Sequence, residues 1–374
     1  MRWIAIAAGL FVCLIGAGAL LAVNQNAANS LVAPVSPTPR AADLIPPTPS
    51  ATTAALTPTP TVQPPTDTPR LPTATPRPPT LTPTPVAPLT GHIVYSVFNP
   101  QYTDLKAYDV YISAVDGSDR RLIAPRRRQP QLSPDGRRIA LRGMEGGKLN
   151  LFILNLQSGV EQLVEHTHEE ASLPSWSSDG QLAVFSSSEM PDRAWRLCTI
   201  NVQRPPENCA WLKVGPYVLL GRYPTWMANG QIVYSGCNYY WGTTGECGLI
   251  RVNADGSSPA LITAEPQDGV DTAPANAGET VLFMSRRDGN WEIYKVPLAG
   301  GKATNLTKNP ADDGLPALSP DEKFIAFVSN RSGQWAVWAM RTDGSDARLL
   351  FPLGGGYSVE PDMDFMTERI SWGP

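Results

Sequence analysis

A repeated phrase is the feature that most constrains this chain. PQLSPDGRRIAL begins at Pro130, and PALSPDEKFIAF begins at Pro316, almost two hundred residues later. A period of 40 to 50 residues indicates either one propeller blade or one pair of helices per repeat. The phrase at Pro274 is degenerate, because Gly278-Glu279 replaces its Asp-Gly turn. Related phrases start at prolines 42 to 50 residues apart: Pro130, Pro174, Pro224, Pro274, Pro316 and Pro361.

Tight-turn dipeptides favour the propeller. Asp135-Gly136, Asp179-Gly180 and Asn229-Gly230 each lie between two short β-prone runs. A third run follows, such as WEIYKV at Trp291, and then a second turn, such as Asp343-Gly344, and a short fourth run. Four turn-linked antiparallel strands make one blade, whereas helical repeats would show a period of about 3.6 residues. The sequence therefore predicts an all-β, six-bladed β-propeller over residues 91–374, and a seven-bladed ring is the alternative.

The two ends of this region predict how the ring closes. The opening GHIVYSV at Gly91 matches the second strand of a repeat, and the final phrase PDMDFMTERISW at Pro361 supplies a first strand. A late strand that completes the first blade would remove the open edges that invite aggregation.

The repeat also carries a family resemblance. The phrase P-x-[W/L]-S-x-D-G-x-x-I-A-F, followed by SNRSGQWAVWAMRTDGSDARLL, resembles the TolB-type propeller repeat, and the similarity covers residues 91–374. The propellers of prolyl-oligopeptidase-like peptidases and of tricorn are similar to the same repeat. The residues before 91 do not resemble the small α/β domain that precedes the propeller in TolB. We therefore expect a TolB-like propeller without a Tol–Pal role.

The N-terminal residues predict a membrane tether. Residues 3–23, WIAIAAGLFVCLIGAGALLAV, contain no charged side chain and would span roughly 31 Å, against a hydrocarbon core of about 30 Å. We expect a transmembrane signal-anchor over residues 1–23, with a cleaved signal peptide as the alternative. Arg2 favours a cytoplasmic N-terminus and an extracytoplasmic propeller at the cell membrane. Residues 34–88 hold 18 of the 38 prolines, which predicts a disordered Pro/Thr-rich linker over residues 24–90.

Four cysteines predict two local disulfides. Cys198 and Cys209 bracket one predicted hairpin loop, and Cys237 and Cys247 bracket the next, so each pair can come within bonding distance. Four reduced thiols, or pairs that cross between blades, are the alternatives. Disulfides would fit an oxidising compartment outside the membrane.

The chain lacks the usual signs of catalysis. His166 and His168, in the stretch HTHEE, could hold a metal only with a third ligand from elsewhere, and His92 is the one other histidine. No G-x-S-x-G motif is present. We therefore expect no cofactor and no enzymatic activity. A propeller-type carbohydrate lyase, a class that uses a His-rich metal centre, is an alternative.

Charged residues before the repeat prolines form the candidate binding site. Arg127, Glu170, Asp271 and Asp313 occupy nearly equivalent slots, and a propeller would gather them around one axis, at the channel mouth. Such a ring could hold a peptide end or a cation, or it could be solvated rim charge. The run of arginines at 126–128 is expected to be a solvated loop. The aromatic trio Tyr239, Tyr240 and Trp241 is the alternative surface.

Together these features predict a membrane-tethered, extracytoplasmic, non-enzymatic binding or scaffold module. Its partner would be an envelope protein, a peptide or a glycan. A formal net charge of −4 gives no indication of nucleic acid binding. A ligand sensor that signals to a separate membrane partner is the alternative.

Overall fold

The computed structural model describes residues 88–102, 108–164, 170–188, 192, 194–204, 209–239, 245–264, 271–354 and 367–374. The chain divides into two units, residues 1–81 and 82–374, and every described residue belongs to the second. The predicted transmembrane anchor and nearly all of the predicted linker lie outside the described residues. Among the described residues, no helix is both long and apolar enough to cross a membrane.

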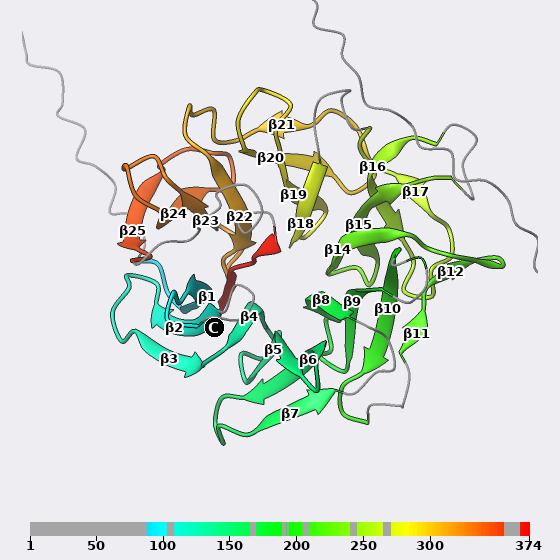
Figure 1. The fold of residues 1–374 in the computed structure, drawn as a ribbon. Coiled ribbons are helices and arrows are strands. Elements are labelled where there is room, and N and C mark those ends of the chain that lie inside the picture. Colours follow the sequence, from blue (N-terminus) through cyan, green and yellow to red (C-terminus); the bar gives the residue numbers. More distant parts are fainter. Residues whose placement is uncertain are drawn as a thin grey trace, which may run out of the picture. The chain divides into compact units, whose positions relative to one another are not determined.

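The described residues form an all-β propeller of 26 strands, drawn as a ring of sheets in Figure 1. Four separate sheets have four strands each. The first sheet contains β26 (Ser371–Gly373), β1 (His92–Phe98), β2 (Tyr108–Ala114) and β3 (Arg121–Ala124). The others are β14 (Gly221–Trp226), β15 (Ile232–Cys237), β16 (Cys247–Val252) and β17 (Ala260–Leu261); β18 (Asp271–Ala277), β19 (Thr280–Ser285), β20 (Glu292–Pro297) and β21 (Thr304–Asn305); and β22 (Asp313–Leu318), β23 (Phe324–Ser329), β24 (Ala336–Arg341) and β25 (Arg348–Pro352).

The repeats that start at Pro130 and Pro174 share one eight-stranded sheet, so the prediction of six separate four-stranded blades needs correction. A single parallel bridge between Leu149 and Glu170 joins the two halves, because β6 is long enough to reach the first residue of β8. A two-stranded hairpin, β12 (Lys213–Val214) and β13 (Tyr217–Val218), follows this sheet. The eight strands are β4 (Arg127–Leu132), β5 (Arg138–Glu145), β6 (Lys148–Asn155), β7 (Glu161–Val164), β8 (Glu170–Trp176), β9 (Leu182–Ser188), β10 (Trp195–Asn201) and β11 (Ala210–Trp211).

The C-terminal strand closes the ring, as the sequence predicts. β26 pairs antiparallel with β1, so that Ile93 lies opposite Trp372. β26 starts at Ser371, near the end of the phrase PDMDFMTERISW, and not at Pro361, where that phrase begins. Figure 1 shows these last residues, in red, inside the ring near β1, β4 and β22.

The repeated phrase is the turn that leads from the first to the second strand of a repeat. In the repeat at Pro130, the hydroxyl of Ser133 donates to the carboxylate of Asp135 at 2.5 Å and accepts the backbone N–H of Arg138 at 3.0 Å. Gly136 completes the turn with a φ of 67°, which favours glycine. The same hydrogen bonds recur around Ser177 and Ser319. Three repeats therefore build this turn with the Ser-x-Asp pattern, whereas the repeat at Pro224 forms its turn from Met227 to Gly230 without it.

A second constraint lies at the repeat prolines. The ladder between the first and second strands shifts register around the proline in each of five repeats, as between Arg128 and Gln131. Proline has no N–H to donate, so a bulge at this point costs no ladder hydrogen bond. The residue before each proline has a positive φ of 48° to 56°: Gln129, Leu173, Tyr223, Ala273 and Leu315.

Apolar clusters between neighbouring sheets hold the ring together. Val184 and Leu197, for example, pack with Ile232, Tyr234 and Ile250 of the next sheet, and all five are fully buried. Each fully buried aliphatic or aromatic side chain stabilises the fold by about 1.5–3 kcal/mol. Because each sheet packs on its neighbours, the repeats depend on one another.

Both predicted disulfides are confirmed. Cys198 bonds to Cys209 with a Cα–Cα distance of 5.8 Å, and Cys237 bonds to Cys247 with a Cα–Cα distance of 3.9 Å. Cys237 and Cys247 form the last pair of the β15–β16 ladder, so the second bond links the two strands where the hairpin loop begins.

Replacing Cys237 and Cys247 together with serine should lower the free energy of unfolding by about 2–3 kcal/mol, because the bond closes a loop of 10 residues. Both side chains are only half-buried, so the serines add little desolvation cost. Chemical denaturation of the purified protein, followed by tryptophan fluorescence, measures the change. An unchanged midpoint would contradict the role of this bond.

Candidate binding pocket in the central channel

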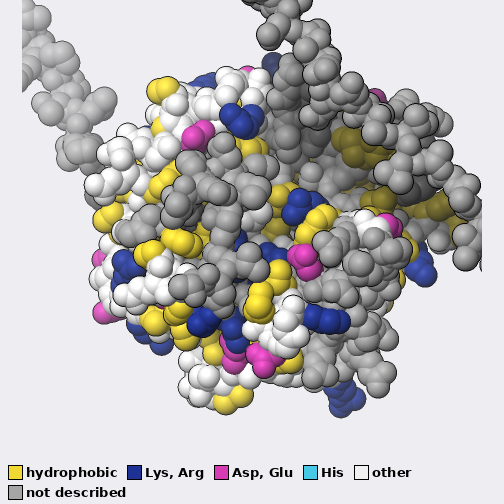
Figure 2. Space-filling view, viewed as in Figure 1, with side chains coloured by type: hydrophobic (Ala, Val, Ile, Leu, Met, Phe, Trp, Pro, Cys, Tyr) yellow, Lys and Arg dark blue, Asp and Glu magenta, His cyan; other side chains and the backbone are white. Residues whose placement is uncertain are grey.

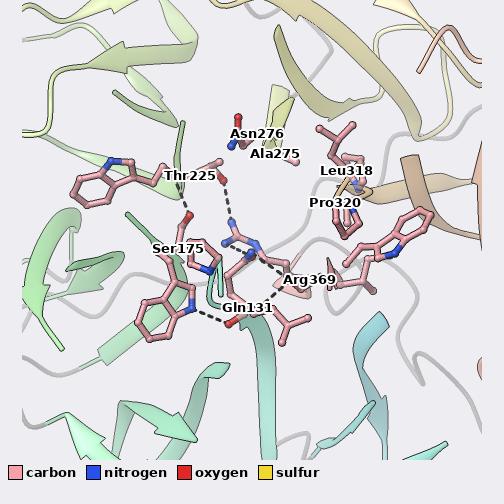
Figure 3. Close-up of a pocket in the computed structure, with 18 of the residues that line it drawn as sticks. Gln131, Ser175, Thr225, Ala275, Asn276, Leu318, Pro320 and Arg369 are labelled. Carbon is pink, nitrogen blue, oxygen red and sulfur yellow. Dashed lines mark hydrogen bonds between the residues drawn. The ribbon is translucent and has the colours of Figure 1, made fainter. Parts of the chain in front are cut away.

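A pocket of about 410 Å³ lies on the axis of the ring. Its walls come from the residues that follow the repeat prolines and from the C-terminal segment 368–374. Ser133, Pro134 and Ser178 belong to the turns that lead into the second strands, so the pocket extends toward that end of the channel. Figure 3 shows Arg369 in the middle of this pocket, with Gln131, Ser175 and Thr225 around the end of its side chain.

The guanidinium of Arg369 is held by neutral acceptors. Its Nη1 donates to the carbonyl of Pro174 at 2.7 Å and to the side chain of Gln131 at 3.4 Å. Its Nη2 donates to the carbonyl of Pro224 at 3.2 Å and to the hydroxyl of Thr225 at 3.3 Å. Two repeat prolines therefore turn their carbonyls toward the axis, where the bulges place them. Burial lowers the pKa of Arg369 to about 10, so it stays charged at neutral pH.

A buried ion pair fixes the C-terminal segment beside the pocket. Glu368 pairs with Arg128 of β4, and it also accepts the backbone N–H of Gln129 at 3.2 Å. The side chain of Gln129 donates to the carbonyl of Thr367 at 2.6 Å. Burial raises the pKa of Glu368, and Arg128 opposes this by favouring the charged form. Because Arg128 neutralises Glu368, the carboxylate contributes little net charge to the pocket.

Three of the four residues predicted for the channel mouth form ion pairs with neighbouring side chains. Arg127 stacks on Phe152, with its Cζ 3.9 Å from the ring centroid, and pairs with Glu161 at 2.6 Å. Glu170 pairs with Arg142 at 2.9 Å. The charges are thus satisfied by local partners.

Asp313 is not a rim charge, because its side chain is fully buried and pairs with Arg331 at 2.6 Å. Burial raises the pKa of Asp313. Asp271 begins β18, but its side chain is outside the described part of the structure. Arg127, Glu170 and Asp313 do not line the pocket, and the predicted channel-mouth site stays a prediction separate from it.

The arginine run at 126–128 is not a solvated loop either. Arg126 stacks on Tyr102 at 4.7 Å, and Arg127 and Arg128 make the ion pairs described above. Long arginine side chains can cover apolar surface while their heads stay paired.

Figure 2 shows basic and acidic side chains interspersed on the visible face, consistent with the small net charge.

The remaining predicted residues are largely outside the described structure. Tyr239 is 64% exposed, but Tyr240 and Trp241 are not described, so the aromatic surface stays a prediction. His166 and His168 are also not described. Within the described ranges, no three His, Cys, Asp or Glu residues group closely enough to hold a metal.

Known proteins share this fold. Residues 258–371 match the family model of the TolB beta propeller domain. No curated protein sequence matches the chain. TolB from Acinetobacter baumannii is 16% identical with a TM-score of 0.58, over 76% of this chain and 67% of that one. Putative TolB from Agrobacterium tumefaciens is 17% identical with a TM-score of 0.54, over 76% and 99%.

A third similar structure comes from a different kind of protein. Hydrazine synthase from Kuenenia stuttgartiensis is 12% identical with a TM-score of 0.56, over 79% of this chain and half of that one. Identities this low show the fold alone. The chain therefore carries a TolB-like β-propeller, as its repeats predicted.

Asp313→Ala should lower the free energy of unfolding by about 3–5 kcal/mol, because it leaves the half-buried guanidinium of Arg331 without its counter-charge. Asp192→Ala is the matched control. Asp192 also pairs with an arginine, Arg196, but its carboxylate is 54% exposed, so we expect a loss of about 0–1 kcal/mol. Urea denaturation of both variants gives the comparison, and equal losses would contradict it.

Proposed function

We propose that this chain is a non-enzymatic binding or scaffold module whose binding site is the channel pocket. The observation that carries the proposal is the channel pocket, which is lined by residues from five repeats and from the C-terminal segment. Its volume is within the range of about 300–1,000 Å³ that is usual for ligand sites.

The chemistry of the walls supports binding. Met227, Leu318 and Pro320 offer apolar surface, while Ser175 and other polar groups offer hydrogen bonds. Ligand sites commonly combine a mainly apolar wall with a few polar groups that fix orientation. The pocket is too small for a folded domain, so we propose that it receives a short segment of a partner protein.

We also propose that the propeller is tethered to a membrane and lies on its extracytoplasmic side. The uncharged residues 3–23 and the two disulfides support this placement. The Pro/Thr-rich residues 34–88 would then act as a spacer. We further propose that the eight-stranded sheet acts as two blades, giving six repeats around the axis. Recovery of the whole chain in the soluble fraction without detergent would contradict the tether.

Two alternatives remain as predictions. An envelope sensor would bind through the same pocket and pass a signal to a separate membrane partner. A metal-dependent carbohydrate lyase would need His166 and His168, whose surroundings the described residues do not include. Metal analysis of the purified protein distinguishes the lyase from the binding module.

Ala228→Trp should abolish capture of the partner. Ala228 is exposed in the turn after β14 and lines the pocket, so an indole there would fill the opening without disturbing the core. Ala254→Trp is the matched control, because Ala254 is exposed in another turn away from the pocket. Crosslinking in native membranes, followed by purification and mass spectrometry, measures capture. Equal capture by both variants would refute the pocket as the binding site.

A further inference from the structure

Arg369 defines what the pocket can accept. We infer that the channel pocket binds the carboxylate of a peptide, with the guanidinium of Arg369 as its anchor. This inference rests on the proposed function, because it names the ligand class of the same site.

The first reason is an uncompensated charge. No described carboxylate lies within ion-pair distance of Arg369, and all four of its acceptors are neutral. Its side chain is partly buried, and burial lowers its pKa, so the charge is less hydrated than that of an exposed arginine. A desolvated cation without a partner attracts an anion more strongly than an exposed one does.

The second reason is the supply of hydrogen-bond donors. Two of the contacts of Arg369, to Gln131 and Thr225, are long at 3.4 and 3.3 Å, and its Nε–H has no acceptor among the described residues. The hydroxyl of Ser175 accepts from the backbone N–H of Trp226 at 3.0 Å, and its own proton has no described acceptor. Asn276 accepts through Oδ1 from Gly278, which leaves its amide N–H groups for a ligand. An entering carboxylate can accept from these groups, and charge-assisted bonds of this kind are strong.

The third reason is the balance of the remaining charges. The other described carboxylates at the pocket are Glu368, Glu322 and the terminal carboxylate of Pro374. Arg128 neutralises Glu368, Glu322 is exposed at the edge, and the exposed Pro374 contacts the ring of His92 at 3.2 Å. None of these carboxylates forms a described contact with Arg369, so its positive charge is not neutralised within the described residues.

The walls favour a peptide as the carrier of the carboxylate. Leu318 and Pro320 lie across the pocket from the end of Arg369, as Figure 3 shows, and Met227 adds apolar surface. An apolar side chain next to a carboxylate would meet this wall while the carboxylate meets Arg369. A chain terminus and an acidic side chain both provide such a group.

Calorimetric titration of the full chain in detergent tests the inference with three probes. The probes are the tripeptide Gly-Leu-Phe with a free C-terminal carboxylate, the same peptide as its C-terminal amide, and N-acetyl-Gly-Glu-Phe amide. The free acid should bind at least about tenfold more tightly than its amide, because only the acid can accept charge-assisted bonds from Arg369. The third probe shows whether a side-chain carboxylate serves as well as a terminus.

Substitutions of Arg369 test whether its charge selects the carboxylate, and a folding check excludes loss of structure as the cause. Arg369→Gln should remove most of the difference between acid and amide, and Arg369→Lys should keep part of it because the charge remains. Glu279→Gln, in an exposed turn outside the pocket, is the control and should bind the acid as tightly as the wild type. Thermal unfolding of each variant checks that it folds, and the acid–amide comparison in the wild type stands even if Arg369→Gln does not fold.

Two outcomes would overturn the inference. Equal affinity for acid and amide in the wild type, including no binding of either, shows that the pocket does not select a carboxylate. An acid–amide difference that survives in folded Arg369→Gln shows that another group selects it. In either case, partner capture that is lost only in Ala228→Trp would leave the proposed function standing, so the two failures are distinguishable.

Discussion

The bulge at each repeat proline is the constraint on which the rest of this structure depends. Proline cannot donate to the ladder, so the first strand of five repeats shifts register there. At Pro174 and Pro224, the freed carbonyl oxygens face the axis and accept from Arg369. Pro274 likewise accepts from the hydroxyl of Thr225 at 2.5 Å. The repeat thus lines the channel with acceptors, and such a channel favours a donor at its centre.

Closure of the ring supplies that donor. β26 completes the first sheet, and the ion pair between Glu368 and Arg128 fixes the residues just before it. Arg369 is then placed on the axis between two partners that are far from it in sequence. The channel pocket is therefore a consequence of closure, because the C-terminal segment that closes the ring also carries Arg369, the charge at its centre.

Much of the fold could be predicted because short sequence patterns determine its turns, strands and hairpins. Asp135-Gly136 and its equivalents mark turns, alternating apolar runs mark strands, and Cys237 and Cys247 lie close enough in sequence to indicate one hairpin. The fusion of two repeats into one sheet depends on a single bridge, Leu149 to Glu170, for which no pattern exists. The site was harder to predict. Asp313 looked like a rim charge, yet burial depends on how the strands pack, and Arg369 carries no motif. A signal was available all the same, because Arg369 lies in the phrase at Pro361 that was predicted to supply the closing strand.

Hydrogen exchange of the C-terminal peptide 367–374 in the intact protein tests the central claim most directly. If this segment closes the ring and holds Arg369 in the channel, the amides that pair with β1 should exchange as slowly as those of the inner strand β22. Exchange at the rate of an unstructured tail would contradict the account, because neither the closure nor the charged pocket would then exist.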